Sequence, residues 1–245
     1  MLLAIDTATQ HISLALHDGD AVTAEQTWHS PNNHTIELAP AVSVMLARAN
    51  LTIDALTHLA VCVGPGSYSA LRIGVAFAKG LASVRKIPLC GVNTFDIAAR
   101  AFDIWQDDGG RDALMITAQA GRGRVLACRY QYDSEHWTRY EAPEGEPTEP
   151  ELYDWDALMD VIQAMDQFVI ITGEVDGHGR EVIQTRRDQL GNHARFWLAP
   201  PALRMRRAAH LADAAWEQFR TPSAKREAFN AAAVKPVYIK TKDSP

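Results

Sequence analysis

The chain has 245 residues, which exceeds a typical domain of roughly 100 to 150 residues, so two cores of modest size are expected. Its hydrophobic content of 47% is ordinary for a globular protein, and its net charge of −6 argues against non-specific nucleic-acid binding by the whole chain. No apolar run approaches the ~20 residues of a membrane span, the N-terminus has no basic leader, and the cysteines lack CxxC spacing. We therefore expect a cytoplasmic protein with reduced thiols and no membrane contact.

The first hundred residues predict a strand meander followed by alternating helices and strands. Three short strands joined by tight turns are predicted at 2–7, 11–17 and 22–28. A helix, a strand, a second helix and a final strand follow at 35–49, 58–63, 69–84 and 89–92. A parallel crossover after an antiparallel meander is the ribonuclease-H-like arrangement.

A similar order restarts after the polar stretch 106–111, so the chain is predicted to be a duplication without detectable sequence repetition. Strands are predicted at 113–118, 124–132, 136–141, 168–172 and 195–198, and helices at 155–165, 179–188 and 203–219. The acidic, proline-containing segment 141–160 is interpreted as an exposed loop or helix lead-in. We expect an N-terminal domain at 1–103, a second domain at 112–220, and a basic tail segment at 221–245 that can pack back on a domain.

The turn at Gly64-Pro65-Gly66 is the most informative local feature, because an apolar strand runs through it directly into a helix. This geometry points backbone N–H groups at one spot and is compatible with anion binding. Glycines also occur wherever a tight turn needs their freedom of φ. The sequence leaves both interpretations open.

The helix behind this turn has two apolar faces. One is a ridge without side-chain bulk, made by Ala70, Gly74, Ala78 and Ala82, and another backbone is expected to pack close against it. The second face carries larger side chains, at Ile73, Phe77, Leu81 and Val84. Such a helix belongs in a core or an interface, and the sequence does not say which face serves which purpose.

Several motifs together carry a family resemblance. They are AIDTATQHISLAL at 4–16, HTIELAP at 34–40, GPGSYSALRIG at 64–74, AKGLA at 78–82, GRGRV at 121–125 and KPVYIK at 235–240. As a set they closely resemble the TsaB family, also called YeaZ. The resemblance implies an α/β fold of tandem ribonuclease-H-like domains, the plan of the actin, hexokinase and Hsp70 superfamily.

The resemblance also implies a role in tRNA modification. TsaB is regarded as a non-catalytic paralogue of TsaD within the machinery that adds a threonylcarbamoyl group to N6 of the adenosine next to the anticodon, in tRNAs reading codons that begin with A. TsaD performs the transfer with a metal and a carbamoyl-adenylate, and the ATPase TsaE joins the pair. We therefore expect no cofactor on this chain, ATP and metal on a TsaD-like partner, indirect contact with tRNA, and a homodimer in isolation.

In that family the N-terminal helices bind TsaD. We therefore expect 35–49 and 69–84 to enter a shared helical bundle. The expected partner-interface residues are Leu38, Val42 and Met45, which supply volume, and Ala70, Gly74 and Ala78, which permit close approach. A bulky residue at Gly74 then abolishes pairing and leaves the fold intact; unfolding instead places the ridge in the chain's own core.

The superfamily resemblance assigns Asp6 to the position that helps hold metal-bound phosphates. With Gly64 and Gly66 it forms a vestigial nucleotide position, unless Asp6 merely caps its turn. TsaD-like enzymes carry His-x-x-x-His after the strand that corresponds to 89–92, whereas this chain reads VNTFDIAA at 92–99. We therefore expect neither a metal site nor peptidase activity.

One hairpin departs from the family pattern. The family usually reads close to Asp-Ala-Arg-x-Gly-Glu-Val, whereas this chain has Gln119 and Arg124 at the two acidic positions. This change removes a candidate carboxylate pair and leaves open whether partner or tRNA contacts there follow the family.

Two rival functions remain open from the sequence. The first is a stand-alone small-molecule kinase of the same superfamily, using Asp6 and the Gly64 turn on ATP. The second is a bare RNA-binding module, because the residues from Arg204 to the end include nine Lys or Arg and only four Asp or Glu. Against the kinase, the sequence lacks the second obvious glycine-rich phosphate loop that such an enzyme would need.

Overall fold

The computed structural model describes residues 1–104, 112–141, 148–222 and 226–238. Within them the chain forms two compact units. Unit 1 contains Met1–Ile97 and the described residues from Arg207 onward, and unit 2 contains Ala98–Arg206. The expected limits 1–103 and 112–220 differ from these units at two places: residues 98–103 belong to unit 2, and the chain returns to unit 1 at Arg207, before its last long helix.

Unit 1 is built on a five-stranded sheet in the order β3-β2-β1-β4-β5. Its strands are β1 (Leu2–Asp6), β2 (His11–His17), β3 (Val22–His29), β4 (His58–Gly64) and β5 (Leu89–Asn93). β1, β2 and β3 are antiparallel, and β4 and β5 run parallel to β1. All five were predicted, because their apolar side chains alternate or run continuously between turn residues.

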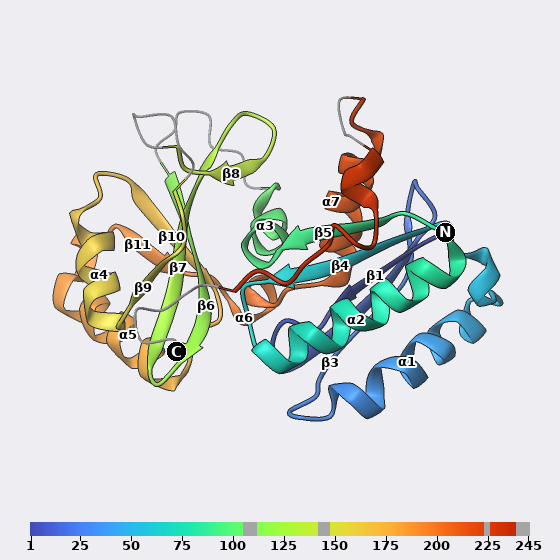
Figure 1. The fold of residues 1–245 in the computed structure, drawn as a ribbon. Helices are drawn as coiled ribbons and strands as arrows, with labels where there is room; N and C mark the ends of the chain where they lie inside the picture. The colour runs from blue at the N-terminus through green and yellow to red at the C-terminus, as the bar shows by residue number, and fades with distance from the viewer. Residues whose placement is uncertain (105–111, 142–147, 223–225, 239–245) are drawn as a thin grey trace. The chain divides into compact units, whose positions relative to one another are not determined.

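Two helices, α1 (His34–Arg48) and α2 (Tyr68–Arg85), pack side by side on one face of this sheet (Figure 1). The short η1 (Ile53–Ala55) follows α1. Leu38 and Val42 of α1 and Ala78 of α2 are buried in one cluster with strand residues such as Ile5 and Val61. Both helices therefore use one face to close the core of unit 1.

The opposite face of the sheet is covered by α7 (Ala208–Arg220). We predicted a single helix at 203–219 in the second domain, and this prediction is wrong. α6 (Pro201–Arg204) ends first, the backbone is extended at Met205 and Arg207, and α7 then begins in unit 1.

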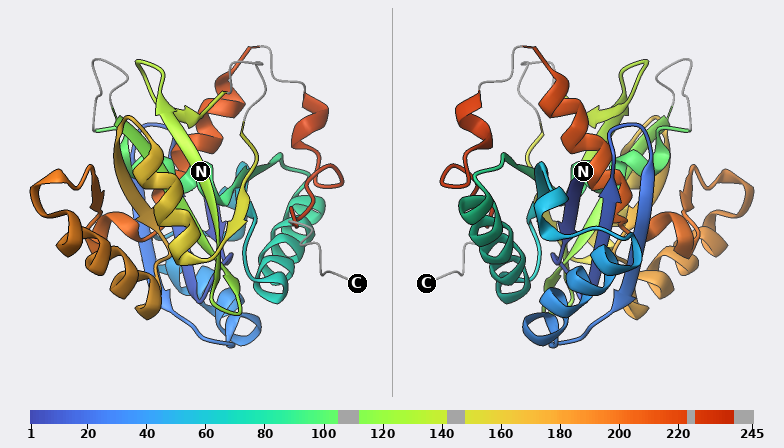
Figure 2. Two further views of the ribbon diagram at one scale, coloured as in Figure 1. Left: turned by 90° about the vertical axis from the view of Figure 1, so that its left-hand side faces the viewer. Right: turned by 90° about the vertical axis from the view of Figure 1, so that its right-hand side faces the viewer.

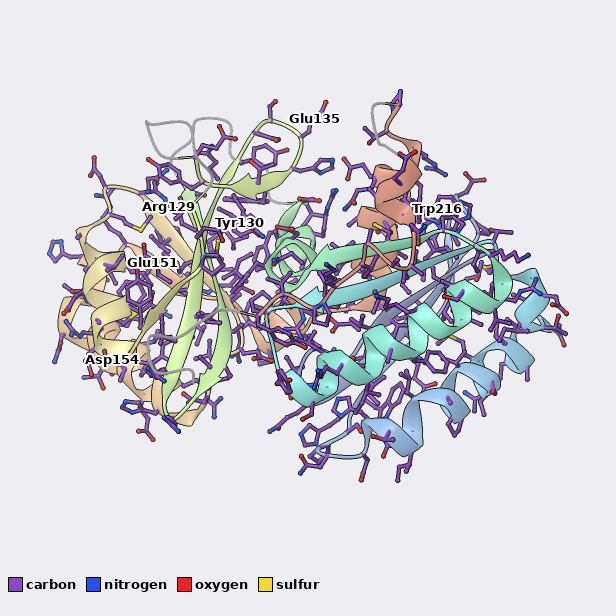
Figure 3. The ribbon with its side chains drawn as sticks, in the orientation of Figure 1. Arg129, Tyr130, Glu135, Glu151, Asp154 and Trp216 are labelled. Carbon is purple, nitrogen blue, oxygen red and sulfur yellow. The ribbon has the colours of Figure 1, made fainter. Side chains whose placement is uncertain are left out.

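Contacts at both ends hold α7 on the sheet. At its start, the Ala208 N–H donates to Ser13 Oγ (2.8 Å) and the Ala209 N–H donates to Glu25 Oε1 (3.0 Å). Toward its end, Trp216, labelled in Figure 3, lies with its ring centroid 4.7 Å from that of His58 on β4.

The described part of the C-terminal tail also packs on unit 1. After η4 (Arg226–Phe229), the Val237 N–H donates to the Val63 carbonyl (2.7 Å), and Lys79 Nζ donates to the Val234 carbonyl (2.9 Å). The expected tail segment 221–245 thus packs back on a domain at 226–238, and residues 223–225 and 239–245 lie outside the described part of the chain.

Unit 2 repeats the strand order of unit 1. Its main sheet contains β6 (Asp112–Gly121), β7 (Arg124–Tyr132), β8 (Trp137–Arg139), β10 (Phe168–Gly173) and β11 (Phe196–Leu198). The order is β11-β10-β6-β7-β8, with β7 and β8 antiparallel and β10 and β11 parallel, as in unit 1. The predicted duplication is confirmed.

The helices α4 (Trp155–Ala164) and α5 (Gly177–Leu190) cover one face of that sheet (Figure 2). α3 (Thr94–Ala99) and η2 (Arg100–Phe102) precede the sheet, and η3 (Gly191–His193) follows α5. The loop interpretation of 141–160 is wrong at β9 (Glu151–Tyr153), which pairs with β7. Among the helices described, none combines the length and hydropathy required to cross a membrane.

Candidate functional site

Two turns of unit 1 that the sequence associated with phosphate binding lie against each other. The β1–β2 turn begins at Asp6, whose side chain is only 2% exposed and accepts a hydrogen bond from the Ala8 N–H (2.8 Å). The turn before α2 contributes the Ser67 N–H, which donates to the Ala8 carbonyl (2.8 Å). An amide of the glycine turn is thus bound to the neighbouring turn of the same chain.

The β1–β2 turn is also held from two other elements. His34 Nε2 lies 2.8 Å from the Thr9 carbonyl and must donate to it, because a carbonyl oxygen only accepts. The Ser30 N–H donates to the Gln10 carbonyl (2.7 Å). With these anchors, the contacts of Asp6 fit the turn-capping alternative, since its carboxylate stabilises the local backbone.

Backbone proximity accounts for the two glycines of the second turn. A Cβ at Gly66 would lie 2.2 Å from the Ala8 carbonyl oxygen, and a Cβ at Gly64 would lie 2.8 Å from the Val237 carbonyl oxygen. Gly64 also has a φ of +103°, which favours glycine. Both positions therefore require glycine for packing, whatever the turn binds.

The segment that replaces the paired histidines is structural. Asn93 Oδ1 accepts from the Phe95 N–H (2.8 Å), and Thr94 Oγ1 donates to the Pro65 carbonyl (2.7 Å). Phe95 and Ile97 are fully buried. Across the described ranges, no three His, Cys, Asp or Glu side chains form a group that could hold a metal ion.

The six residues expected at the partner interface are all buried within this chain. They are Leu38, Val42, Met45, Ala70, Gly74 and Ala78. The small ridge does permit close approach, but the approaching segment is the first turn of unit 1. A Cβ at Gly74 would lie 2.2 Å from Thr7 Oγ1, which itself donates to the Ala70 carbonyl (2.8 Å). These six side chains therefore pack within unit 1, and their role at a partner interface stays a prediction.

Several apolar side chains are exposed on α1, η1 and α2. Among them are the aliphatic side chains of Ile36 (70% exposed), Val44 (47%), Ile53 (43%) and Val84 (81%). On the same elements lies a groove of about 350 Å³, lined by Ala39, Val42, Ser43, Leu46, Ala47, Leu51, Thr52, Ile53 and Phe77. Small residues are exposed there on α2, at Ala76, Gly80 and Ser83. We call this surface the outer helix face.

The sequence indicated part of this surface, since Phe77 and Val84 belong to the second apolar face expected for α2. It did not single out Ile36 and Val44 on α1, or Ala76 and Gly80, which precede Val84 at every fourth residue on α2. Residues four apart lie on one side of a helix. Since the buried ridge follows the same spacing, the pattern alone could not rank the two lines.

Comparison with known proteins decides the family. The model of the TsaD family, tRNA N6-adenosine threonylcarbamoyltransferase, matches residues 22–144, half of the chain. The tRNA threonylcarbamoyladenosine biosynthesis protein TsaB of Buchnera aphidicola is 31% identical over 150 residues, which cover 61% of this chain and 67% of that protein. The chain belongs to the TsaB family.

Other TsaB proteins are similar over a shorter stretch. The TsaB proteins of Bacillus subtilis and Escherichia coli are each 34% identical, over 134 and 132 residues respectively. Each match covers 54% of this chain and 55% of the relative. The chain thus spans about half the length of these curated relatives.

Solved structures support the fold. YeaZ from Pseudomonas aeruginosa superimposes with a TM-score of 0.67 at 22% identity, covering 97% of this chain and 99% of that chain. A putative N-acetylmannosamine kinase from Listeria monocytogenes does so with a TM-score of 0.51 at 11% identity, covering 90% and 99%. The TsaB family member described here therefore has the expected fold of two tandem ribonuclease-H-like domains.

Proposed function

We propose that this chain is a cytoplasmic, non-catalytic subunit required for adding the threonylcarbamoyl group to N6 of the adenosine next to the anticodon in tRNAs reading codons that begin with A. It pairs with a TsaD-like transferase, a TsaE-like ATPase joins the pair, and tRNA is engaged through the complex. The observation that carries the proposal is the similarity to TsaB proteins together with an apolar outer helix face on the matching half of the chain.

Two features of unit 1 support a non-catalytic role. The Ser67 amide and the Asp6 carboxylate are engaged within the chain, so the two turns are tied to each other. Buried Phe95 and Ile97 occupy the segment where a TsaD-like enzyme carries its metal-binding histidines. ATP and metal therefore belong on the TsaD-like partner in this proposal.

The outer helix face is the proposed binding surface for that partner. Ile36, Val44, Ile53 and Val84 expose apolar surface on neighbouring elements of unit 1, exposed apolar patches mark interaction sites, and the groove gives a partner's side chains a place to bind. A stable interface of this kind should bury more than about 1,000 Å². Without the transferase, the same face is expected to pair with a second copy of the chain.

The test reconstitutes the modification. A TsaD-like protein, a TsaC-type synthase and TsaE are incubated with tRNA, with and without this chain, and threonylcarbamoyl transfer is measured. Modification that depends on the chain, while the chain alone transfers nothing, supports the proposal. Transfer that is indifferent to the chain overturns it.

Matched variants test the surface. In Ile36→Glu/Val84→Glu, two exposed apolar residues of the outer helix face become charged, and binding to the TsaD-like partner is expected to fall at least tenfold. Val161→Glu is the control, because Val161 is also apolar and exposed but lies on α4 in unit 2. Loss of pairing in the control, or normal pairing in the double variant, contradicts the assignment.

A further inference from the structure

Five arginines lie on the segments that follow the carboxyl ends of three parallel strands in unit 2, β6, β10 and β11. They lie on the turn from β6 to β7, at the start of α5, and on or just after α6: Arg122, Arg124, Arg180, Arg204 and Arg206. The turn lies at one end of the sheet in Figure 1. We call this set the arginine edge. In open α/β sheets, ligands bind outside the carboxyl ends of the strands.

Two carboxylates lie at this edge: Asp176 caps α5, and Glu174 pairs within unit 2. Its Oε2 accepts from the Gln119 N–H (2.8 Å), and its Oε1 lies 3.8 Å from Nη1 of Arg206. Glu174 is therefore engaged inside unit 2, and it balances one of the five positive charges.

Two nitrogen atoms at the edge are buried with no acceptor among the described residues. They are Nε of Arg204 and Nε2 of Gln119. Burial, with the nearby charge of Arg180 as a second cause, lowers the pKa of Arg204. Buried donors and adjacent like charges are both costly, and an anion bound beside them offsets both costs.

The sequence of the β6–β7 hairpin points the same way. Gln119 and Arg124 stand where the family pattern implied by the resemblance has acidic residues, and Gly121 stands where it has Arg. Relative to that pattern, two negative charges are absent, one positive charge is added at Arg124 and one is absent at Gly121. In the adjacent α5, the Asp176 carboxylate caps the N-terminal end by accepting from the Gly179 N–H (2.7 Å), and Arg180 lies in the first turn and donates to the Val175 carbonyl (2.9 Å). The positive charges of the hairpin and of Arg180 favour a ligand that carries negative charge.

We propose that the arginine edge binds the phosphodiester backbone of RNA. The choice of tRNA as that RNA rests on the proposed function. A single phosphate would need one cradle, whereas these arginines extend from three separate elements, and Arg122 and Arg180 are exposed. Arginine binds phosphate oxygens with paired, charge-assisted hydrogen bonds, so successive phosphates of one strand match this arrangement.

The experiment measures binding of fluorescently labelled tRNA to the full chain by anisotropy, over a series of salt concentrations. The test variant is Arg122→Asn/Arg180→Gln; Asn suits residue 122, whose φ is +55°. Arg187→Gln is the control, because it removes another exposed positive charge, from the far end of α5. At about 0.1 M salt, the double variant should bind roughly tenfold more weakly, with the slope of log K against log salt reduced by about 1 to 2.

Several results would overturn this proposal. They are no tRNA binding by the unchanged chain, equal loss in Arg187→Gln, or no loss in the double variant. Inorganic phosphate and ATP serve as second probes. If the double variant loses binding of phosphate or ATP but still binds tRNA, the edge is a small-anion site and RNA binding there is refuted.

The inference and the proposed function fail separately. The double variant Arg122→Asn/Arg180→Gln and the control Arg187→Gln are both expected to keep their binding to the TsaD-like partner, since these arginines lie in unit 2 and the outer helix face lies in unit 1. If threonylcarbamoyl transfer to tRNA is the same with and without the chain, the proposed function is refuted. Arginine-dependent tRNA binding measured in the same preparation would still support RNA recognition at the edge.

Discussion

Two glycines on one helix provide a direct test of which face of α2 is internal. Gly74 and Gly80 lie six residues apart, and each is replaced by alanine. A Cβ at Gly74 would stand 2.2 Å from Thr7 Oγ1, whereas a Cβ at Gly80 would have no atom within 4 Å. The two substitutions share their chemistry and their helix, so any difference between them reports the packing of the ridge.

The magnitudes have opposite signs. Replacing glycine by alanine inside a helix stabilises it by about 0.8 to 1 kcal/mol, and Gly80→Ala should show this gain. At Gly74, overpacking costs about 1 to 3 kcal/mol. Displacement of Thr7 also weakens its hydrogen bond to the Ala70 carbonyl, worth about 1 kcal/mol. Gly74→Ala should therefore be destabilised by about 1 to 3 kcal/mol net, which separates the variants by roughly 2 to 4 kcal/mol.

Urea unfolding followed by circular dichroism measures this difference through the shift of the midpoint. If Gly74→Ala is as stable as Gly80→Ala, the ridge does not contact the first turn, and the packing described for α2 is refuted. If Gly74→Ala stays stable and loses only its binding to a TsaD-like partner, the buried ridge is an interface after all.

Three further predictions concern unit 1. Burial, and after it the N-terminal ammonium, lowers the pKa of His58 below its ordinary 6.5. The stability that neutral His58 contributes is therefore present above pH 6.5 and is lost as the pH falls through the folded pKa. In His58→Gln, the free energy of unfolding should fall less steeply between about pH 7 and pH 5. Glu25→Gln should lower the free energy of unfolding by about 0.5 to 2 kcal/mol, because Glu25 binds the Ala209 N–H and Arg207 at the start of α7; an unchanged urea midpoint contradicts this. Burial raises the pKa of the Cys90 thiol to about 12, so iodoacetamide at about pH 8 should label Cys90 far more slowly in the folded chain than in urea, as peptide mass spectrometry can establish; equal rates refute the burial.

Most strands and long helices were predictable because their apolar periods are long and are bounded by turn residues. β9 was missed, since a three-residue strand within an acidic, proline-containing segment has no measurable period. The break at Met205–Arg207 was missed because the apolar pattern continues across it. What interrupts the helix is the passage of the chain from unit 2 to unit 1, and local sequence does not encode that.

The candidate site was only partly predictable for a related reason. The superfamily resemblance associated Asp6 with the Gly64 turn, and in the structure both lie at the ends of neighbouring strands of one sheet. It could not show that Ala8 contacts Ser67, since this depends on how far the turn extends. On α2 the spacing identified two apolar lines, but only the position of the sheet decides that Gly74 is internal and Val84 external.

The return of α7 has a consequence for biosynthesis. A nascent chain emerges from its N-terminus, so β1 to β5 and their first helix layer are complete while the other face of the sheet is bare. That face is lined by Leu2, Ala4, Ala15 and Ala60, and α7 covers it only after all of unit 2 has been translated. Translation arrested before Arg207 therefore leaves a half-covered sheet, a substrate for chaperones and proteases.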